Sequence, residues 1–203
     1  MRDACGPDFG IAIDFHGRVH KGMAKVLAKE LEPVKPLFIE EPVLPENNEA
    51  LADLRGVCSI PIATGERQFT RWGFKQLLAS GGADIIQPDV SHCGGISELK
   101  KIAAMAEAYH IQVAPHCYCG PIVGAANIQL ATTLPNFLIL ESLKQWDGFH
   151  EKLLKKKLEW QDGNVIPSKE PGLGVELDEA VCEAHPYSGK ELHLQMAQDP
   201  LFP

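Results

Sequence analysis

Six short apolar runs in this chain each end in an acidic residue or a histidine, and their spacing is nearly constant. The end positions are Asp14, Glu40, Glu66, Asp89, His116 and Glu141. Subtracting successive positions gives intervals of 26, 26, 23, 27 and 25 residues. Each interval is long enough for one strand, one helix and the loops that join them. The repeat therefore predicts that strands and helices alternate along most of the chain.

Apolar residues at helical spacing fill the intervals between these runs. The predicted helices cover residues 21–32, 47–57, 71–79, 97–109 and 122–133. Such alternation forms a parallel sheet covered by helices, and all its strands end at the same edge. We predict an α/β fold, a partial (β/α)₈ TIM-type barrel of about six strands, with the six ionisable side chains gathered at its mouth. The alternative is that each of these residues only caps the helix that follows it. Capping would explain a single strand end, but it explains six poorly, because Ser and Asn, two preferred cap residues, occur at none of the six positions.

The repeat ends after Glu141. Residues 151–157 predict a basic helical turn, and residues 160–165 predict a hairpin around Asp162-Gly163. Residues 171–203 are rich in Pro and Gly and predict an ordered but irregular C-terminal tail. We find no low-complexity linker, so we expect residues 1–203 to form a single domain.

Composition narrows the classes of partner. The formal net charge is −8 and the sequence pI is near 5.5, which argues against nucleic acid or an anionic membrane as the main partner. No apolar run approaches the roughly 20 residues needed to span a bilayer. No apolar segment typical of a secretory signal follows Met1, and the six cysteines are scattered without a disulfide pattern. We therefore expect a cytoplasmic protein with reduced thiols.

The first three end positions suit a hard metal ion. Asp14, Glu40 and Glu66 would share one barrel mouth, where three carboxylates repel one another and need a cation. They offer only oxygen ligands, which favours Mg²⁺ over Zn²⁺. A zinc site at His92-Cys93 and 116–119 is the weaker alternative, because Cys-x-Cys is tighter than the usual zinc knuckle and no second pair is evident.

Histidines supply candidates for proton transfer. Asp89 and His116 end adjacent predicted strands, and a carboxylate bonded to one imidazole nitrogen raises the basicity of the other. His116 is therefore the candidate base. His16, two residues after Asp14, lies on the same strand face and could be the complementary acid.

Substrate contacts are less clear from the residues. Arg18, Arg67 and Tyr118 are candidates, since each follows a predicted strand end closely. Trp146 could reach the pocket or pack in the core, and the sequence leaves both open.

Five short motifs resemble a known family. They are Asp14-Phe15-His16-Gly17-Arg18, Phe38-Ile39-Glu40-Glu41-Pro42, Gly65-Glu66-Arg67, Gln87-Pro88-Asp89 and Ala114-Pro115-His116. Together they resemble the enolase superfamily and, within it, the mandelate racemase subgroup and its galactonate dehydratases. The resemblance runs from about residue 10 to residue 141, and residues 171–176 also resemble that subgroup's tail.

The resemblance implies a Mg²⁺-dependent sugar-acid dehydratase that acts on galactonate. Asp14, Glu40 and Glu66 would bind Mg²⁺. His116, oriented by Asp89, would take the substrate's C2 proton.

The remaining roles follow from the same resemblance. His16 would protonate the departing C3 hydroxyl, and Glu141 would be a hydrogen-bond partner of the substrate. His16, His116, Glu141 and Arg18 are thus the expected substrate-binding residues.

The resemblance also implies what surrounds these residues in a longer protein. An N-terminal capping domain and the first two βα units would precede this chain, and residues 143–203 would pack on that capping domain. The partner would be a small sugar acid, and a full-length family member would be a homo-oligomer.

Three alternatives stay open. The substrate could be another aldonic acid of the same subgroup, or the chain could be a catalytically inactive truncated fragment. A racemase would need a second base facing His116, commonly a Lys from a strand outside this sequence.

Overall fold

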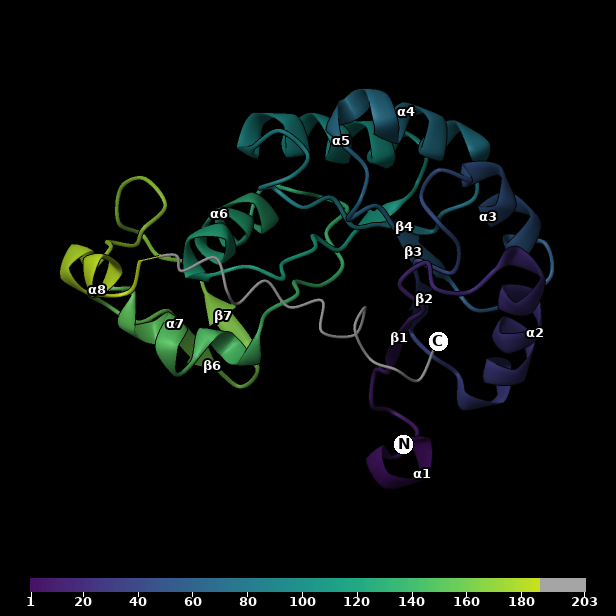
Figure 1. The fold of residues 1–203 in the computed structure, drawn as a ribbon, viewed down its shortest axis with the longest axis horizontal. Helices are drawn as coiled ribbons and strands as arrows, with labels where there is room; N and C mark the ends of the chain where they lie inside the picture. The colour runs from purple at the N-terminus through teal and green to yellow at the C-terminus, as the bar shows by residue number, and fades with distance from the viewer. Residues whose placement is uncertain (187–203) are drawn as a thin grey trace.

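A curved parallel sheet forms the centre of the protein, and helices line its outer side (Figure 1). The computed structural model describes residues 1–186, so the last part of the predicted tail, 187–203, lies outside the described residues. The strands are β1 Ala12–Asp14, β2 Phe38–Glu40, β3 Ile62–Thr64, β4 Ile85–Ile86 and β5 Gln112–Val113. They pair in sequence order, and every pair is parallel. The predicted partial barrel is confirmed.

One helix follows each strand. These helices are α2 Lys21–Leu31, α3 Asn48–Arg55, α4 Thr70–Ser80, α5 Ile96–Ala108 and α6 Pro121–Ala131. Their bounds agree with the sequence-based ranges to within two residues at each end. Within residues 1–186, no helix combines the length and the apolar character needed to cross a membrane.

Burial on both faces of the sheet explains the continuous apolar runs. Ile39, Ile62 and Ile86 are fully buried in the large core between the sheet and the helices. Phe38 and Ile85, the residues just before two of them, pack in a separate cluster on the concave face. Because side chains alternate along a strand, Glu40, which follows Ile39, turns to the concave face, and Glu41 turns to the helix side.

The sixth predicted strand is present only as a single bridge. Phe137 pairs with Val113 in an isolated parallel bridge. Two backbone hydrogen bonds hold it, from Val113 N–H to Asn136 O (2.9 Å) and from Leu138 N–H to Val113 O (2.8 Å). Among the described residues no strand pairs with its other side, so the ladder ends after this contact.

The segment after Glu141 contains more helix than predicted. Short elements are η2 Lys144–Trp146, α7 Phe149–Lys152 and α8 Glu179–Ala184, while α1 Arg2–Cys5 and η1 Glu32–Val34 lie earlier in the chain. The predicted helical turn at 151–157 is thus displaced toward α7. The hairpin is confirmed as β6 Glu159–Gln161 and β7 Asn164–Ile166, with Asp162 and Gly163 at φ 49° and 78° in its turn. Leu177 forms an antiparallel bridge with Leu154, which ties the described part of the tail to this region.

Candidate active site

The three predicted metal ligands lie at the ends of three neighbouring strands. Asp14 ends β1 and is paired in register with Glu40 at the end of β2. Glu66 follows β3. The imidazole Nδ1 of His16 lies 3.1 Å from Asp14 Oδ2 and 3.5 Å from Glu66 Oε1. His16 therefore lies between two of the three carboxylates and joins the loops after β1 and β3.

Glu40 shows how much negative charge gathers here. Its burial is the main cause that raises the pKa of its carboxyl group to about 7, and the charges of Asp14, Glu141 and Glu66 raise it further. The side chain of Gln87 opposes this shift. Carboxylates gathered in this way repel one another, and a hard divalent cation that binds their oxygens would neutralise their charge. The residues present fit Mg²⁺ in chemical type.

The positions of these side chains differ from those of a closed metal site. Among residues 1–186, no three His, Cys, Asp or Glu side chains are grouped closely enough to hold a metal ion as they stand. The two oxygens of Glu66 contact histidines, Oε1 at 3.5 Å from His16 and Oε2 at 3.0 Å from His116. In this structure the Glu66 carboxylate therefore lies between two imidazoles.

His116 and Asp89 form the predicted dyad. His116 Nδ1 is 2.7 Å from Asp89 Oδ2, and its Nε2 is 3.0 Å from Glu66 Oε2 and 4.0 Å from Glu141 Oε2. Burial alone would lower the pKa of His116, but the hydrogen bonds to Asp89 and Glu66 and the charges of Glu141 and Glu66 raise it to about 10. His116 is therefore an imidazolium in this arrangement of the site.

Asp89 is held by a partner that the sequence analysis missed. Its carboxylate is fully buried, and its Oδ1 accepts hydrogen bonds from the Ser91 hydroxyl (2.5 Å) and the Ser91 N–H (2.7 Å). Burial raises the pKa of Asp89, but the hydrogen bonds from His116 and Ser91 outweigh it and bring the pKa to about 2. The signal was the Asp-x-Ser spacing, which is typical of a side chain that bonds its own backbone two residues on. Asp89 is thus kept ionised and fixed in orientation.

Glu141 reaches the same site from outside the ladder. Its side chain is 45% exposed, and Oε2 accepts a hydrogen bond from the Cys117 N–H at 2.7 Å. The residue after His116 therefore fixes the carboxylate near the imidazole.

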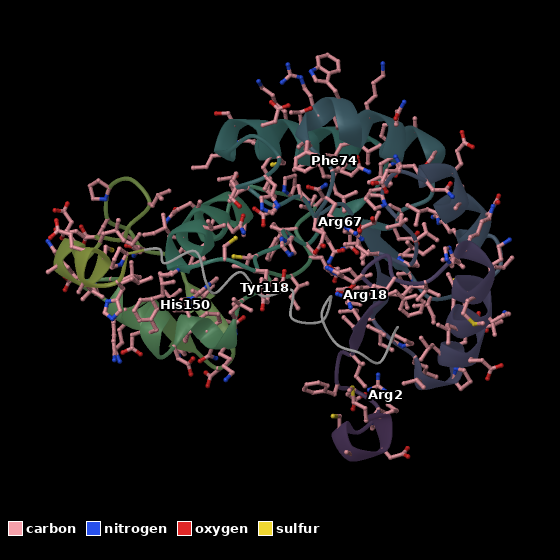
Figure 2. The ribbon with its side chains drawn as sticks, in the orientation of Figure 1. Arg2, Arg18, Arg67, Phe74, Tyr118 and His150 are labelled. Carbon is pink, nitrogen blue, oxygen red and sulfur yellow. The ribbon has the colours of Figure 1, made fainter. Side chains whose placement is uncertain are left out.

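The predicted substrate contacts lie in different settings. Arg18 and Tyr118 lie in the loops after β1 and β5, and both are labelled in Figure 2. Tyr118 and Arg18 are both exposed. Arg67 directs Nε and Nη2 to Glu41, over 2.8 and 2.5 Å. Its role as a substrate contact stays a prediction. Trp146 is buried in the core, with its indole N–H bonded to Cys119 O at 3.1 Å.

The cysteines of the zinc alternative lie close to the dyad. Cys93 and Cys117 are buried, and Cys119 Sγ is 3.8 Å from Ser91 Oγ and 4.0 Å from Asp89 Oδ2. All six cysteines of the chain fall within the described residues and are unpaired.

Comparison with known proteins agrees with this geometry. A family model described as enolase C-terminal domain-like matches residues 1–181. The chain belongs to this family.

Curated relatives are named D-galactonate dehydratase. One from Pectobacterium atrosepticum is 48% identical over 188 residues, which is 88% of this chain and 48% of the relative. One from Ralstonia pickettii is 47% identical over 190 residues, 89% of this chain and 49% of the relative. The chain thus spans about half the length of the curated relatives that it matches.

Solved structures match most of this chain. The mandelate racemase/muconate lactonizing enzyme from Jannaschia sp. CCS1 superimposes with a TM-score of 0.89 at 42% identity, over 95% of this chain and 49% of that one. A protein of the same description from Sulfitobacter sp. has a TM-score of 0.90 at 43% identity, over 95% and 48%.

Proposed function

We propose that this chain carries the catalytic half of a Mg²⁺-dependent sugar-acid dehydratase that converts D-galactonate to 2-keto-3-deoxygalactonate. One observation carries the proposal. An unbroken run of contacts leads from Asp14 through His16, Glu66 and His116 to Asp89, across the ends of four strands. The name of the curated relatives supports galactonate as the substrate.

Removal of the C2 proton falls to His116. Asp89 holds Nδ1, so Nε2 is the atom that can accept a proton. In this structure His116 is protonated and Nε2 bonds to Glu66 Oε2 over 3.0 Å, so His116 has to lose that proton and that hydrogen bond before it can act as the base. Asp14, Glu40 and Glu66 would hold Mg²⁺, which supplies the positive charge that makes a proton beside a carboxylate acidic enough to remove.

Loss of the hydroxyl falls to His16. When the C2–H bond breaks, its electron pair is first held as an enediolate of the C1 carboxylate. That pair then forms the C2=C3 double bond, and the hydroxyl leaves C3 with a proton from His16 as water. The enol then rearranges to the 2-keto-3-deoxy acid. Glu141 and Arg18 would contact the substrate beside the two histidines.

The test is product formation by the 203-residue chain with Mg²⁺ and D-galactonate. We expect 2-keto-3-deoxy acid from the wild-type chain and a rate about 10²- to 10⁴-fold lower from His116→Asn. In D₂O, His16→Asn should exchange the C2 proton for deuterium without eliminating water. His20→Asn is the matched control, because His20 is an exposed helix cap that makes no side-chain capping bond.

Two results would contradict the proposal. Undiminished turnover by His116→Asn would remove His116 from the mechanism. A soluble wild-type chain that neither binds Mg²⁺ nor forms product would favour the inactive-fragment alternative, and turnover of a different aldonic acid would change only the substrate.

A further inference from the structure

Glu41 is a buried carboxylate that the proposed chemistry does not use. It follows Glu40 directly, and its side chain is 0% exposed on the helix side of the sheet. Its backbone is left-handed, with φ 43°, which is uncommon for a residue other than glycine. A buried charge in an unfavourable backbone conformation persists only when its surroundings hold it there.

Four donors around the end of β3 satisfy the Glu41 carboxylate. Oε1 accepts from the Thr64 hydroxyl and from the Gly65 N–H at 3.2 Å. Oε2 accepts from Arg67 Nε and Nη2 at 2.8 and 2.5 Å. Three of these donors, one on Gly65 and two on Arg67, belong to the residues that flank Glu66 in the chain. The side chain of Glu41 therefore holds the residues on both sides of one predicted metal ligand.

The backbone of the same segment holds the loop after β1. The Gly17 N–H donates to Glu41 O at 2.7 Å, and the Phe15 N–H donates to Glu40 O at 2.9 Å. Phe15 and Gly17 flank His16. Residues 40 and 41 thus connect the ends of β1, β2 and β3, where the three predicted metal ligands lie.

Close packing shows that the arrangement leaves little freedom. A Cβ at Gly17 would lie 2.5 Å from Arg67 Nη2 and 3.2 Å from a Leu44 methyl group. Arg67 Nε is 3.8 Å from Glu66 Oε1, farther than from Glu41. The guanidinium is therefore committed to Glu41 and leaves the Glu66 carboxylate for other partners.

We propose that Glu41, with Arg67, is a positioning residue that sets the mutual register of Asp14, Glu40 and Glu66 without binding the metal itself. The inference rests on the proposed Mg²⁺ site. Substitution of a residue that orients metal ligands through hydrogen bonds typically lowers the metal affinity by about 10- to 100-fold. Glu41→Gln keeps the shape and an acceptor oxygen but removes the charge that Arg67 needs.

The experiment measures Mn²⁺ binding to the 203-residue chain by electron paramagnetic resonance, and amide hydrogen exchange without metal. We expect Glu41→Gln to weaken Mn²⁺ binding about 10- to 100-fold and to speed exchange in residues 14–19 and 64–68. Arg67→Lys keeps the charge but not the two-pronged geometry, and should weaken binding less.

A second ion pair provides the control. Glu98 accepts from the Arg71 N–H at 2.9 Å and from Arg71 Nη1 at 2.7 Å, and joins α5 to α4. Glu98→Gln should lower thermal stability while leaving Mn²⁺ affinity and exchange in the ligand loops unchanged.

Each outcome decides the inference. Suppose that the wild-type chain binds Mn²⁺ and that Glu41→Gln binds it with the same affinity as the wild-type chain or as Glu98→Gln. The positioning role is then wrong, while the proposed function stands. If the wild-type chain binds no Mn²⁺, the proposed metal site fails and the inference fails with it.

Discussion

Substitution of Gly124 by alanine tests how the segment after Glu141 is anchored to the site. Gly124 lies inside α6, and a Cβ there would lie 2.4 Å from Trp146 Cζ2 and 2.7 Å from Cε2 and Cη2. Trp146 is 2% exposed, and its indole N–H holds the Cys119 carbonyl at 3.1 Å, three residues after His116. Its ring also lies 5.9 Å from that of Trp160, so it has little room to move.

Two opposing effects set the magnitude. Alanine in a helix interior is favoured over glycine by about 1 kcal/mol. Overpacking a rigid buried neighbour costs about 1–3 kcal/mol. We expect Gly124→Ala to lower the free energy of unfolding by about 1 kcal/mol in the wild-type chain. In a Trp146→Phe background the benzo-ring atoms that meet the new methyl are gone, so the same change should raise it by about 1 kcal/mol.

The assay is urea unfolding followed by circular dichroism, with the four proteins of the double-mutant cycle compared at constant m-value. Gly22→Ala is the control, since Gly22 lies in α2 and a Cβ added there would meet nothing within 4 Å. That change should stabilise the protein by about 0.5–1 kcal/mol. If Gly124→Ala stabilises the wild-type chain as much as Gly22→Ala does, the packing argument is refuted.

Three further changes test the core and the loops. Phe74 is 0% exposed, so Phe74→Ala should lower the free energy of unfolding, measured in urea, by about 3–5 kcal/mol. An equal loss in a Phe74→Leu control would contradict a cavity effect. Burial raises the pKa of the Cys117 thiol to about 12, so as the pH rises the unfolded chain loses this proton before the folded chain does, near pH 9. Above that pH the free energy of unfolding should fall by about 1.4 kcal/mol per pH unit because of this thiol. Cys117→Ala should show a shallower fall between about pH 9 and 10.5, and an unchanged slope would exclude this thiol as the cause. Gly17 has φ +63°, and a Cβ there would lie 2.5 Å from Arg67 Nη2, whereas Gly81 has φ +67° and a Cβ there would meet nothing within 4 Å. Gly17→Ala should therefore lower the free energy of unfolding more than Gly81→Ala does. Equal losses would show that the close approach is harmless.

Much of the site was predictable because its residues mark the ends of regular elements. Asp14, Glu40 and His116 each follow an apolar run, and parallel strands end at one edge, so sequence spacing alone placed them together. The pairing of His116 with Asp89 followed from adjacent strands in the same way. The orientation of His16 between Asp14 and Glu66 was not predictable, because it depends on a left-handed backbone at His16, φ 52°, in a loop.

The sequence by itself determined the strand–helix order, the end of the sheet that carries the ionisable groups, and the family resemblance. These depend on local periodicity, which records burial within each segment. Tertiary structure decided that the buried Glu41 forms an ion pair with Arg67, 26 residues away, and that residues 137–141 give one bridge in place of a strand. Glu40 and Glu41 look equivalent in sequence. Because side chains alternate along a strand, Glu40 turns to the candidate site, whereas Glu41 is buried on the helix side and pairs with Arg67.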